Sequence, residues 1–203
     1  MSSKVHTPRR ETSRSFKSSV FVMIGLALVI IVSGIGWSIW QNSPAPEIKS
    51  AENISTQPKE IGIQIGKIAP DFTIPTLDGG TFTLANQRGK PTVIFFMADW
   101  CGSCIAEATA LAQLQQEVGT KVSIVVVNVD SSATPERLTQ FKKAAGNGNY
   151  TWAFDTDQTL VVAYQVTSLD TTFILDSDGR IAYRDQIPTP YQILKDELGK
   201  LTQ

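Results

Sequence analysis

The chain has two cysteines in 203 residues, and only two positions separate them, in the segment Trp100-Cys101-Gly102-Ser103-Cys104. Two thiols at this spacing can form a disulfide and release it again, provided that the first sulfur is exposed and its thiolate is stabilised. A bridge around two residues restricts the unfolded chain little, which argues against a purely structural disulfide. A structural zinc site needs four ligands, and the one histidine, His6, lies near the N-terminus. The pair therefore predicts dithiol redox chemistry.

The two cysteines are expected to have different roles because of their places relative to a predicted helix. Apolar residues recur at helical spacing over Ser103–Val118, which predicts a helix that begins at the cysteine pair. Cys101 then lies at the helix N-terminus, where free N–H groups and the helix dipole favour a thiolate, so it is the expected nucleophile. Cys104, one turn further along, is expected to resolve a mixed disulfide on Cys101. Trp100 is expected to cover one side of the pair.

The segments that flank this helix are apolar runs rich in β-branched residues. Thr92–Met97 and Lys121–Val129 are typical of central strands covered on both faces, so strand, helix and strand form a βαβ unit. A second helix is predicted over 135–145, where Pro135 follows capping residues. The other expected elements are a small hairpin over 72–74 and 81–84, a hairpin over 171–175 and 181–184, and a last helix over 190–201. The predicted fold class is an α/β three-layer sandwich with a central mixed sheet.

The N-terminal segment has the pattern of a membrane anchor. Five Lys and Arg residues face one acidic residue in the first 17 positions, and Val20–Trp40 contains no charged residue. At about 1.5 Å per residue this run spans roughly 30 Å, the thickness of one hydrocarbon core. Positive charge before the span keeps the N-terminus inside, so residues 1–19 are predicted to be a cytoplasmic tail and 20–40 a signal anchor. A cleaved signal peptide is the alternative.

The rest of the chain divides into a linker and one domain. Residues 41–66 are polar and contain several prolines, which indicates a linker, and residues 67–203 are enough for a domain with its own core. The domain has 11 basic and 15 acidic residues, a net charge of −4, which argues against nucleic-acid binding. The expected location is the cell membrane, crossed once, with the C-terminal domain outside the cytoplasm.

Three segments of the domain carry a family resemblance, namely IAPDFTIPTLDGGTFTL (68–84), GKPTVIFFMADWCGSC (89–104) and TTFILDSDGRI (171–181). Together they resemble the thioredoxin superfamily, and more narrowly the membrane-anchored, TlpA/ResA-like thiol:disulfide oxidoreductases of the AhpC/TSA type. The resemblance implies a thioredoxin-like fold and a reductase of disulfides in apocytochrome c, as in cytochrome c biogenesis, or in copper-site assembly proteins. It also implies recharging by a CcdA- or DsbD-like membrane electron carrier, with no cofactor beyond the redox-active disulfide.

Glu107 matches the acid that ResA-like proteins carry in the pattern C-x-x-E, where it tunes the thiols and moves protons. A carboxylate one turn beyond Cys104 can accept the proton of Cys104 as this sulfur attacks, if burial raises the pKa of Glu107 toward neutrality. The alternative is an exposed helix acid without a role.

Asp170 occupies the position where the family usually has a cis-proline that faces the dithiol. A cis bond before a residue other than proline costs about 3 to 4 kcal/mol, so the Leu169–Asp170 bond is expected to be trans and the loop reshaped. A carboxylate beside Cys101 opposes thiolate formation unless it acts as the base for a thiol. It could also complete a metal site with Cys101 and Cys104. The alternative is a loop residue that caps the next strand.

Other functions fit the sequence less well. A peroxiredoxin would need a threonine three residues before its cysteine, where this chain has Ala98. A copper chaperone would carry C-x-x-x-C and a distal histidine, and the domain has neither. Asp99, beside the pair, is interpreted as a solvated loop residue. We therefore expect an extracytoplasmic disulfide reductase. A dithiol oxidase and a metal-binding module stay as alternatives, because the direction of electron flow depends on the reduction potential.

Overall fold

The computed structural model of the protein describes residues 60–202. Within these residues, no helix has the length and apolar character needed to cross a membrane. The predicted cytoplasmic tail (1–19) and signal anchor (20–40) lie outside the described residues, as does most of the predicted linker (41–66).

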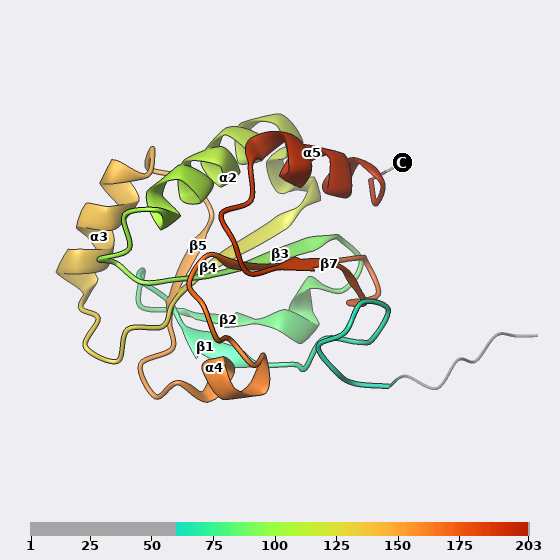
Figure 1. Cartoon of the computed structure of the whole chain (residues 1–203), viewed down its shortest axis with the longest axis horizontal. Helices are drawn as coiled ribbons and strands as arrows, with labels where there is room; N and C mark the ends of the chain where they lie inside the picture. The colour runs from blue at the N-terminus through green and yellow to red at the C-terminus, as the bar shows by residue number, and fades with distance from the viewer. Residues whose placement is uncertain (1–59, 203) are drawn as a thin grey trace, which may run out of the picture. The chain divides into compact units, whose positions relative to one another are not determined.

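A five-stranded mixed sheet forms the centre of the domain (Figure 1), with its strands in the order β5-β4-β3-β6-β7. The strands are β3 (Thr92–Met97), β4 (Ser123–Asn128), β5 (Thr151–Phe154), β6 (Thr171–Leu175) and β7 (Ile181–Asp185). The strand β4 runs parallel to β3 and to β5, whereas β6 runs antiparallel to β3 and to β7. Every residue of β3, β4 and β6 is buried, as expected for central strands covered on both faces.

Three helices pack on one face of the sheet, where α2 and α5 lie side by side (Figure 1). They are α2 (Cys104–Val118), α3 (Pro135–Ala144) and α5 (Tyr191–Gly199). Thr134 caps α3, because its side chain accepts a hydrogen bond from the N–H of Arg137, and Pro135 opens the helix. The core on this face joins the helices to β3, with Phe95 and Leu111 fully buried in it.

The other face of the sheet is covered by a small hairpin and a short helix (Figure 1). The hairpin pairs β1 (Thr73–Pro75) with β2 (Thr81–Thr83), and the helix is α4 (Thr159–Ala163). Aromatic rings of Phe72, Phe96, Tyr164 and Phe173 pack against one another in this second core. Two turns of 3₁₀ helix, η1 (Leu84–Gln87) and η2 (Gly119–Lys121), complete the described elements.

The sequence predicted the two central strands, the helices α2, α3 and α5 and both hairpins to within a few residues. It did not predict β5 or α4, which are only four and five residues long. The folded part also begins before residue 67, where we placed the end of the linker. Ile63 is buried, and the N–H of Gly66 donates to the carbonyl of Ile181 over 2.8 Å, so residues that precede 67 belong to the domain.

Candidate active site

The two cysteines form a disulfide at the point where β3 leads into α2, and their Cα atoms are 5.4 Å apart. The helix begins at Cys104, whose N–H points back to the Sγ of Cys101 over 3.3 Å. A free N–H at the start of a helix stabilises negative charge, so the expected preference for a thiolate at Cys101 has a donor in place. Cys101 is 6% exposed and Cys104 is fully buried. An incoming partner can therefore reach only the first sulfur.

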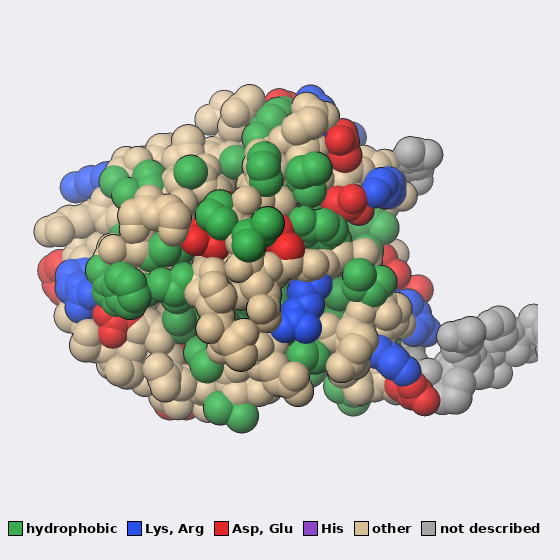
Figure 2. Space-filling view, in the orientation of Figure 1, with side chains coloured by type: hydrophobic (Ala, Val, Ile, Leu, Met, Phe, Trp, Pro, Cys, Tyr) green, Lys and Arg blue, Asp and Glu red, His purple; other side chains and the backbone are tan. Residues whose placement is uncertain are grey.

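Trp100, which precedes the pair, is 66% exposed. Its side chain therefore provides exposed apolar surface next to the disulfide, which a partner protein can contact. Ile187, in the loop between β7 and α5, is 67% exposed as well. Figure 2 shows hydrophobic side chains gathered along the middle of the face that carries this loop, with acidic side chains among them.

Asp170 lies beside Cys101, as the sequence predicted. Its Oδ2 accepts a hydrogen bond from the hydroxyl of Ser103 over 2.7 Å and is 3.9 Å from the Sγ of Cys101. The residue is 95% buried and has a φ of +57°, which a proline cannot adopt, so the loop is reshaped as expected. Its other carboxylate oxygen, Oδ1, is buried and has no hydrogen-bond partner. Asp170 therefore contacts the active site rather than capping only its own strand.

Glu107 is 1% exposed, so the alternative of an exposed helix acid is wrong. Its Oε1 accepts a hydrogen bond from the hydroxyl of Thr172 over 2.5 Å, and its Oε2 accepts one from the N–H of Thr189 over 2.8 Å. Burial raises the pKa of Glu107 to about 8, and the charge of Asp185 acts in the same direction, while the two hydrogen bonds oppose the rise. Near neutral pH this carboxyl can therefore hold a proton or release it.

Asp99 differs from the prediction, because its side chain is 1% exposed rather than solvated. It forms an ion pair with Arg137 of α3 and accepts a hydrogen bond from Nδ2 of Asn128 over 2.9 Å. Arg137 also pairs with Asp130 over 2.9 Å. The cluster ties the end of β3 to α3 and to the loop after β4, which makes Asp99 a structural residue.

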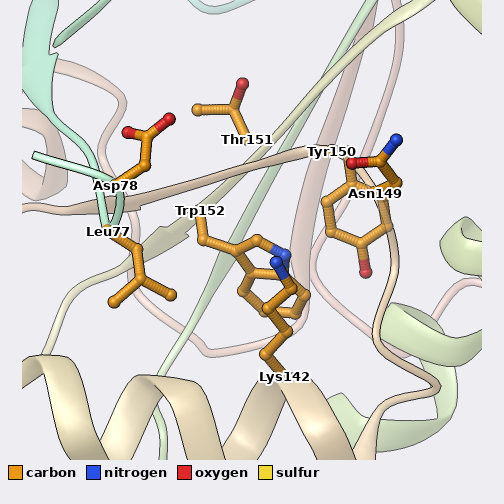
Figure 3. A pocket seen from close by; sticks show the side chains of 7 residues that line it. All are labelled: Leu77, Asp78, Lys142, Asn149, Tyr150, Thr151 and Trp152. Atoms are coloured by element: carbon orange, nitrogen blue, oxygen red, sulfur yellow. The ribbon is translucent and has the colours of Figure 1, made fainter. Parts of the chain in front are cut away.

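One cleft on the described surface measures about 500 Å³ (Figure 3). Its lining residues are Leu77, Asp78, Lys142, Asn149, Tyr150, Thr151 and Trp152. The hydroxyl of Tyr150 donates to the carbonyl of Ala108, and the indole N–H of Trp152 donates to the carbonyl of Gly148. These polar groups form hydrogen bonds with the backbone, and the cleft is not lined by the cysteines, by Glu107 or by Asp170. It is not the site of the redox chemistry.

Comparison with known proteins agrees with this geometry. The model of the AhpC/TSA family matches residues 65–184. The chain is 33% identical to the thioredoxin-like protein YneN of Bacillus subtilis (strain 168) over 160 residues, which cover 78% of this chain and 85% of that protein. It is 29% identical to the thiol-disulfide oxidoreductase ResA of the same organism over 166 residues, which cover 81% and 83%.

A solved structure assigned to a thiol:disulfide interchange protein DsbE from Chlorobium tepidum is also similar. It has a TM-score of 0.63 and 23% sequence identity, and the match covers 70% of this chain and 100% of that chain. This likeness confirms the thioredoxin-like fold that the sequence predicted.

Proposed function

Because the chain belongs to the AhpC/TSA family and is a thiol:disulfide oxidoreductase, we propose that it reduces disulfide bonds of proteins outside the cytoplasmic membrane. The observation that carries this proposal is the asymmetry of the cysteine pair. Cys101 is partly accessible and receives an N–H at the start of α2, whereas Cys104 is fully buried. This is the arrangement that an attacking thiolate and a resolving thiol require.

The reaction starts from the reduced pair. The thiolate of Cys101 attacks one sulfur of a substrate disulfide, the substrate S–S bond breaks, and the released sulfur leaves as a thiolate that takes up a proton. Cys104 then loses its proton and attacks the sulfur of Cys101, which breaks the mixed disulfide and releases the second substrate thiol. Two electrons have passed to the substrate, and the Cys101–Cys104 disulfide remains.

We assign Glu107 as the base that accepts the proton of Cys104. It lies one turn further along α2, it is buried, and its pKa is raised to about 8. Such a carboxyl accepts a proton at neutral to mildly alkaline pH and can return it later. Asp185, on β7, adds to the rise through its charge; it accepts a hydrogen bond from the hydroxyl of Thr189, whose N–H donates to Glu107.

The cellular setting is part of the proposal. The uncharged run over 20–40 with its basic flank supports a single membrane span, with a cytoplasmic tail over 1–19 and the redox domain on a linker outside. Electrons would come from a CcdA- or DsbD-like membrane carrier, and the substrates would be disulfides of apocytochrome c or of copper-site assembly proteins. Exposed Trp100 provides apolar surface for docking such proteins.

The reduction potential tests the direction of electron flow. The full-length chain is equilibrated in glutathione redox buffers, and the fraction of reduced Cys101 is counted by alkylation and mass spectrometry. A value near about −270 mV, as in thioredoxin, is expected for a reductase. A value near about −120 mV, as in DsbA, would mean that the protein is an oxidase and would overturn the proposal.

A further inference from the structure

Three buried side chains converge at the disulfide. Cys101, Cys104 and Asp170 each offer one ligand atom, and these atoms all lie within 4.8 Å of one another. Within residues 60–202, this is the one group of three or more Cys, His, Asp or Glu side chains close enough to share an ion. The group has two sulfurs and one oxygen, which is a donor set suited to zinc.

Asp170 supplies an independent indication of a missing ligand. The residue is 95% buried, and its Oδ1 has no hydrogen-bond partner among the described residues. Buried carboxylates are ordinarily paired with a cation, hydrogen-bonded at both oxygens or bound to a metal. Asp99 satisfies this rule through Arg137, but no ion pair of the described residues includes Asp170.

We propose that the reduced protein binds one zinc ion through the thiolates of Cys101 and Cys104 and the carboxylate of Asp170. Two thiolates alone would favour cuprous copper, whereas the added carboxylate oxygen favours zinc. The fourth position of a tetrahedral zinc is left to water or to the hydroxyl of Ser103, which is 3.3 Å from the Sγ of Cys101. The oxygen ligand comes from the side chain of Asp170 alone, so the site depends on this residue.

The spacing of the ligands fits the ion after reduction. Zinc–sulfur bonds of about 2.3 Å and zinc–oxygen bonds of about 2.0 Å in a tetrahedron put sulfur and oxygen about 3.5 Å apart. The Sγ of Cys101 and the Oδ2 of Asp170 are 3.9 Å apart, so a shift of a few tenths of an ångström brings them into place. Reduction breaks the bond between the two sulfurs and lets them move apart to bind the same ion.

Zinc binding and disulfide formation exclude each other. Both sulfurs bind as thiolates, so binding releases a proton from each cysteine that is still a thiol, without any change of oxidation state. The zinc ion has to leave before the pair can react; a substrate disulfide then oxidises the free dithiol, two electrons pass to the substrate, and the Cys101–Cys104 bond forms. The inference rests on the proposed function in one point, namely that the reduced Cys101–Cys104 pair is the active form of the protein. Zinc would therefore hold the reductase inactive until it is removed.

A zinc titration of the full-length chain tests the site. Protein without an affinity tag is reduced with a phosphine, freed of reductant under argon, and titrated with Zn²⁺ in competition with a chromophoric indicator. We expect one zinc per chain, release of protons from the thiols that bind, seen in weak buffer, and no binding by the oxidised protein. The substitution Asp170→Asn should weaken binding by about 10-fold or more, the scale seen when the surroundings of a zinc site are altered.

Matched variants keep the test decisive. Asn accepts a positive φ as readily as Asp does, so Asp170→Asn should keep the fold, which circular dichroism checks. Asp196→Asn, an exposed acid of α5, is the control that should bind like wild type. Cys101→Ser should abolish tight binding. Equal affinity of wild type and Asp170→Asn would overturn the proposal, as would absence of uptake by the reduced wild type.

Reduction of insulin disulfides, measured in parallel, separates this inference from the proposed function. Added zinc should inhibit turnover by wild type and should inhibit Asp170→Asn only at concentrations about 10-fold higher or more. A chain that reduces insulin but takes up no zinc would contradict the metal site alone. A chain that binds zinc but does not reduce insulin would contradict the proposed function alone.

Discussion

Two buried carboxylates near the disulfide, Glu107 and Asp170, differ in how their oxygens are satisfied. Glu107 lies on the rigid helix α2, and each of its oxygens accepts a hydrogen bond. Asp170 lies in a loop at a positive φ, and only its Oδ2 has a donor, the hydroxyl of Ser103. None of the ion pairs among residues 60–202 includes either acid. Burial raises the pKa of Glu107, so this acid suits the holding of a proton, whereas the unpartnered oxygen of Asp170 suits a further ligand.

The largest expected effect concerns the stability of the protein as a function of pH. The pKa of Glu107 is about 8 in the folded chain and about 4.5 when unfolded, so the folded state keeps a proton that the unfolded state has lost. The free energy of unfolding should therefore fall as pH rises through this window, by roughly 4 kcal/mol between about pH 5 and 8. Glu107→Gln should lack this loss, because the amide resembles the protonated acid.

Urea unfolding at a series of pH values measures this difference. Asp170→Asn serves as the comparison, since we expect it to keep the slope of the wild type. If wild type and Glu107→Gln lost stability in parallel between these pH values, the pocket around Glu107 would not hold a proton, and its contrast with Asp170 would disappear.

The second effect concerns the rate at which Cys104 resolves a mixed disulfide. If Glu107 takes the proton, Glu107→Gln should slow this step by about 100-fold at pH 8, the usual scale of general base catalysis. In wild type the rate should rise with pH toward about 8 as the carboxyl ionises, and in the variant this rise should be absent. Stopped-flow release of a chromophoric thiol from Cys101 reports the step. The same pH profile in both proteins would exclude Glu107 from the proton transfer.

The smallest effect concerns the reactivity of Cys101. The carboxylate of Asp170 lies 3.9 Å from its Sγ and opposes a negative charge there. In Asp170→Asn, alkylation of Cys101 at pH 7 should be roughly tenfold faster, as Coulomb interaction of a partly screened pair at this distance requires. The rates are compared in the presence of a zinc chelator, so that metal binding does not protect the thiol. Equal rates would mean that Asp170 has no influence on the thiol.

Much of the fold was predictable because its central elements are long and strongly patterned. The strands β3 and β4 are continuous apolar runs, and α2 shows helical spacing over its whole length. The four residues of β5 and the five of α4 are too short to show a period, so their places depend on packing against neighbouring elements. The burial of Glu107 did have a local signal, since it lies on the same stripe of α2 as Cys104, Ala108 and Leu111.

Asp99 shows where local reasoning fails. Nothing beside it in the chain indicates a cation, and its partner Arg137 follows 38 residues later on another element. From the sequence alone, a carboxylate next to a cysteine pair is predicted to be exposed. Its burial becomes apparent only when the helix α3, which carries Arg137, is packed beside it. The positive charge that pairs with Asp99 therefore comes only from the packing of α3 against the end of β3.

The sequence by itself determined the reactive pair, its position between a strand and a helix, and the family to which the domain belongs. Those features depend on residue type and on spacing over a few positions. Only the tertiary structure decided what the carboxylates do, because their surroundings come from distant parts of the chain. Thr172 and Thr189 reach Glu107 from 65 and 82 residues away, and Ser103 reaches Asp170 across 67 residues. Burial and hydrogen-bond partners fix the charge of an acid, and folding supplies both.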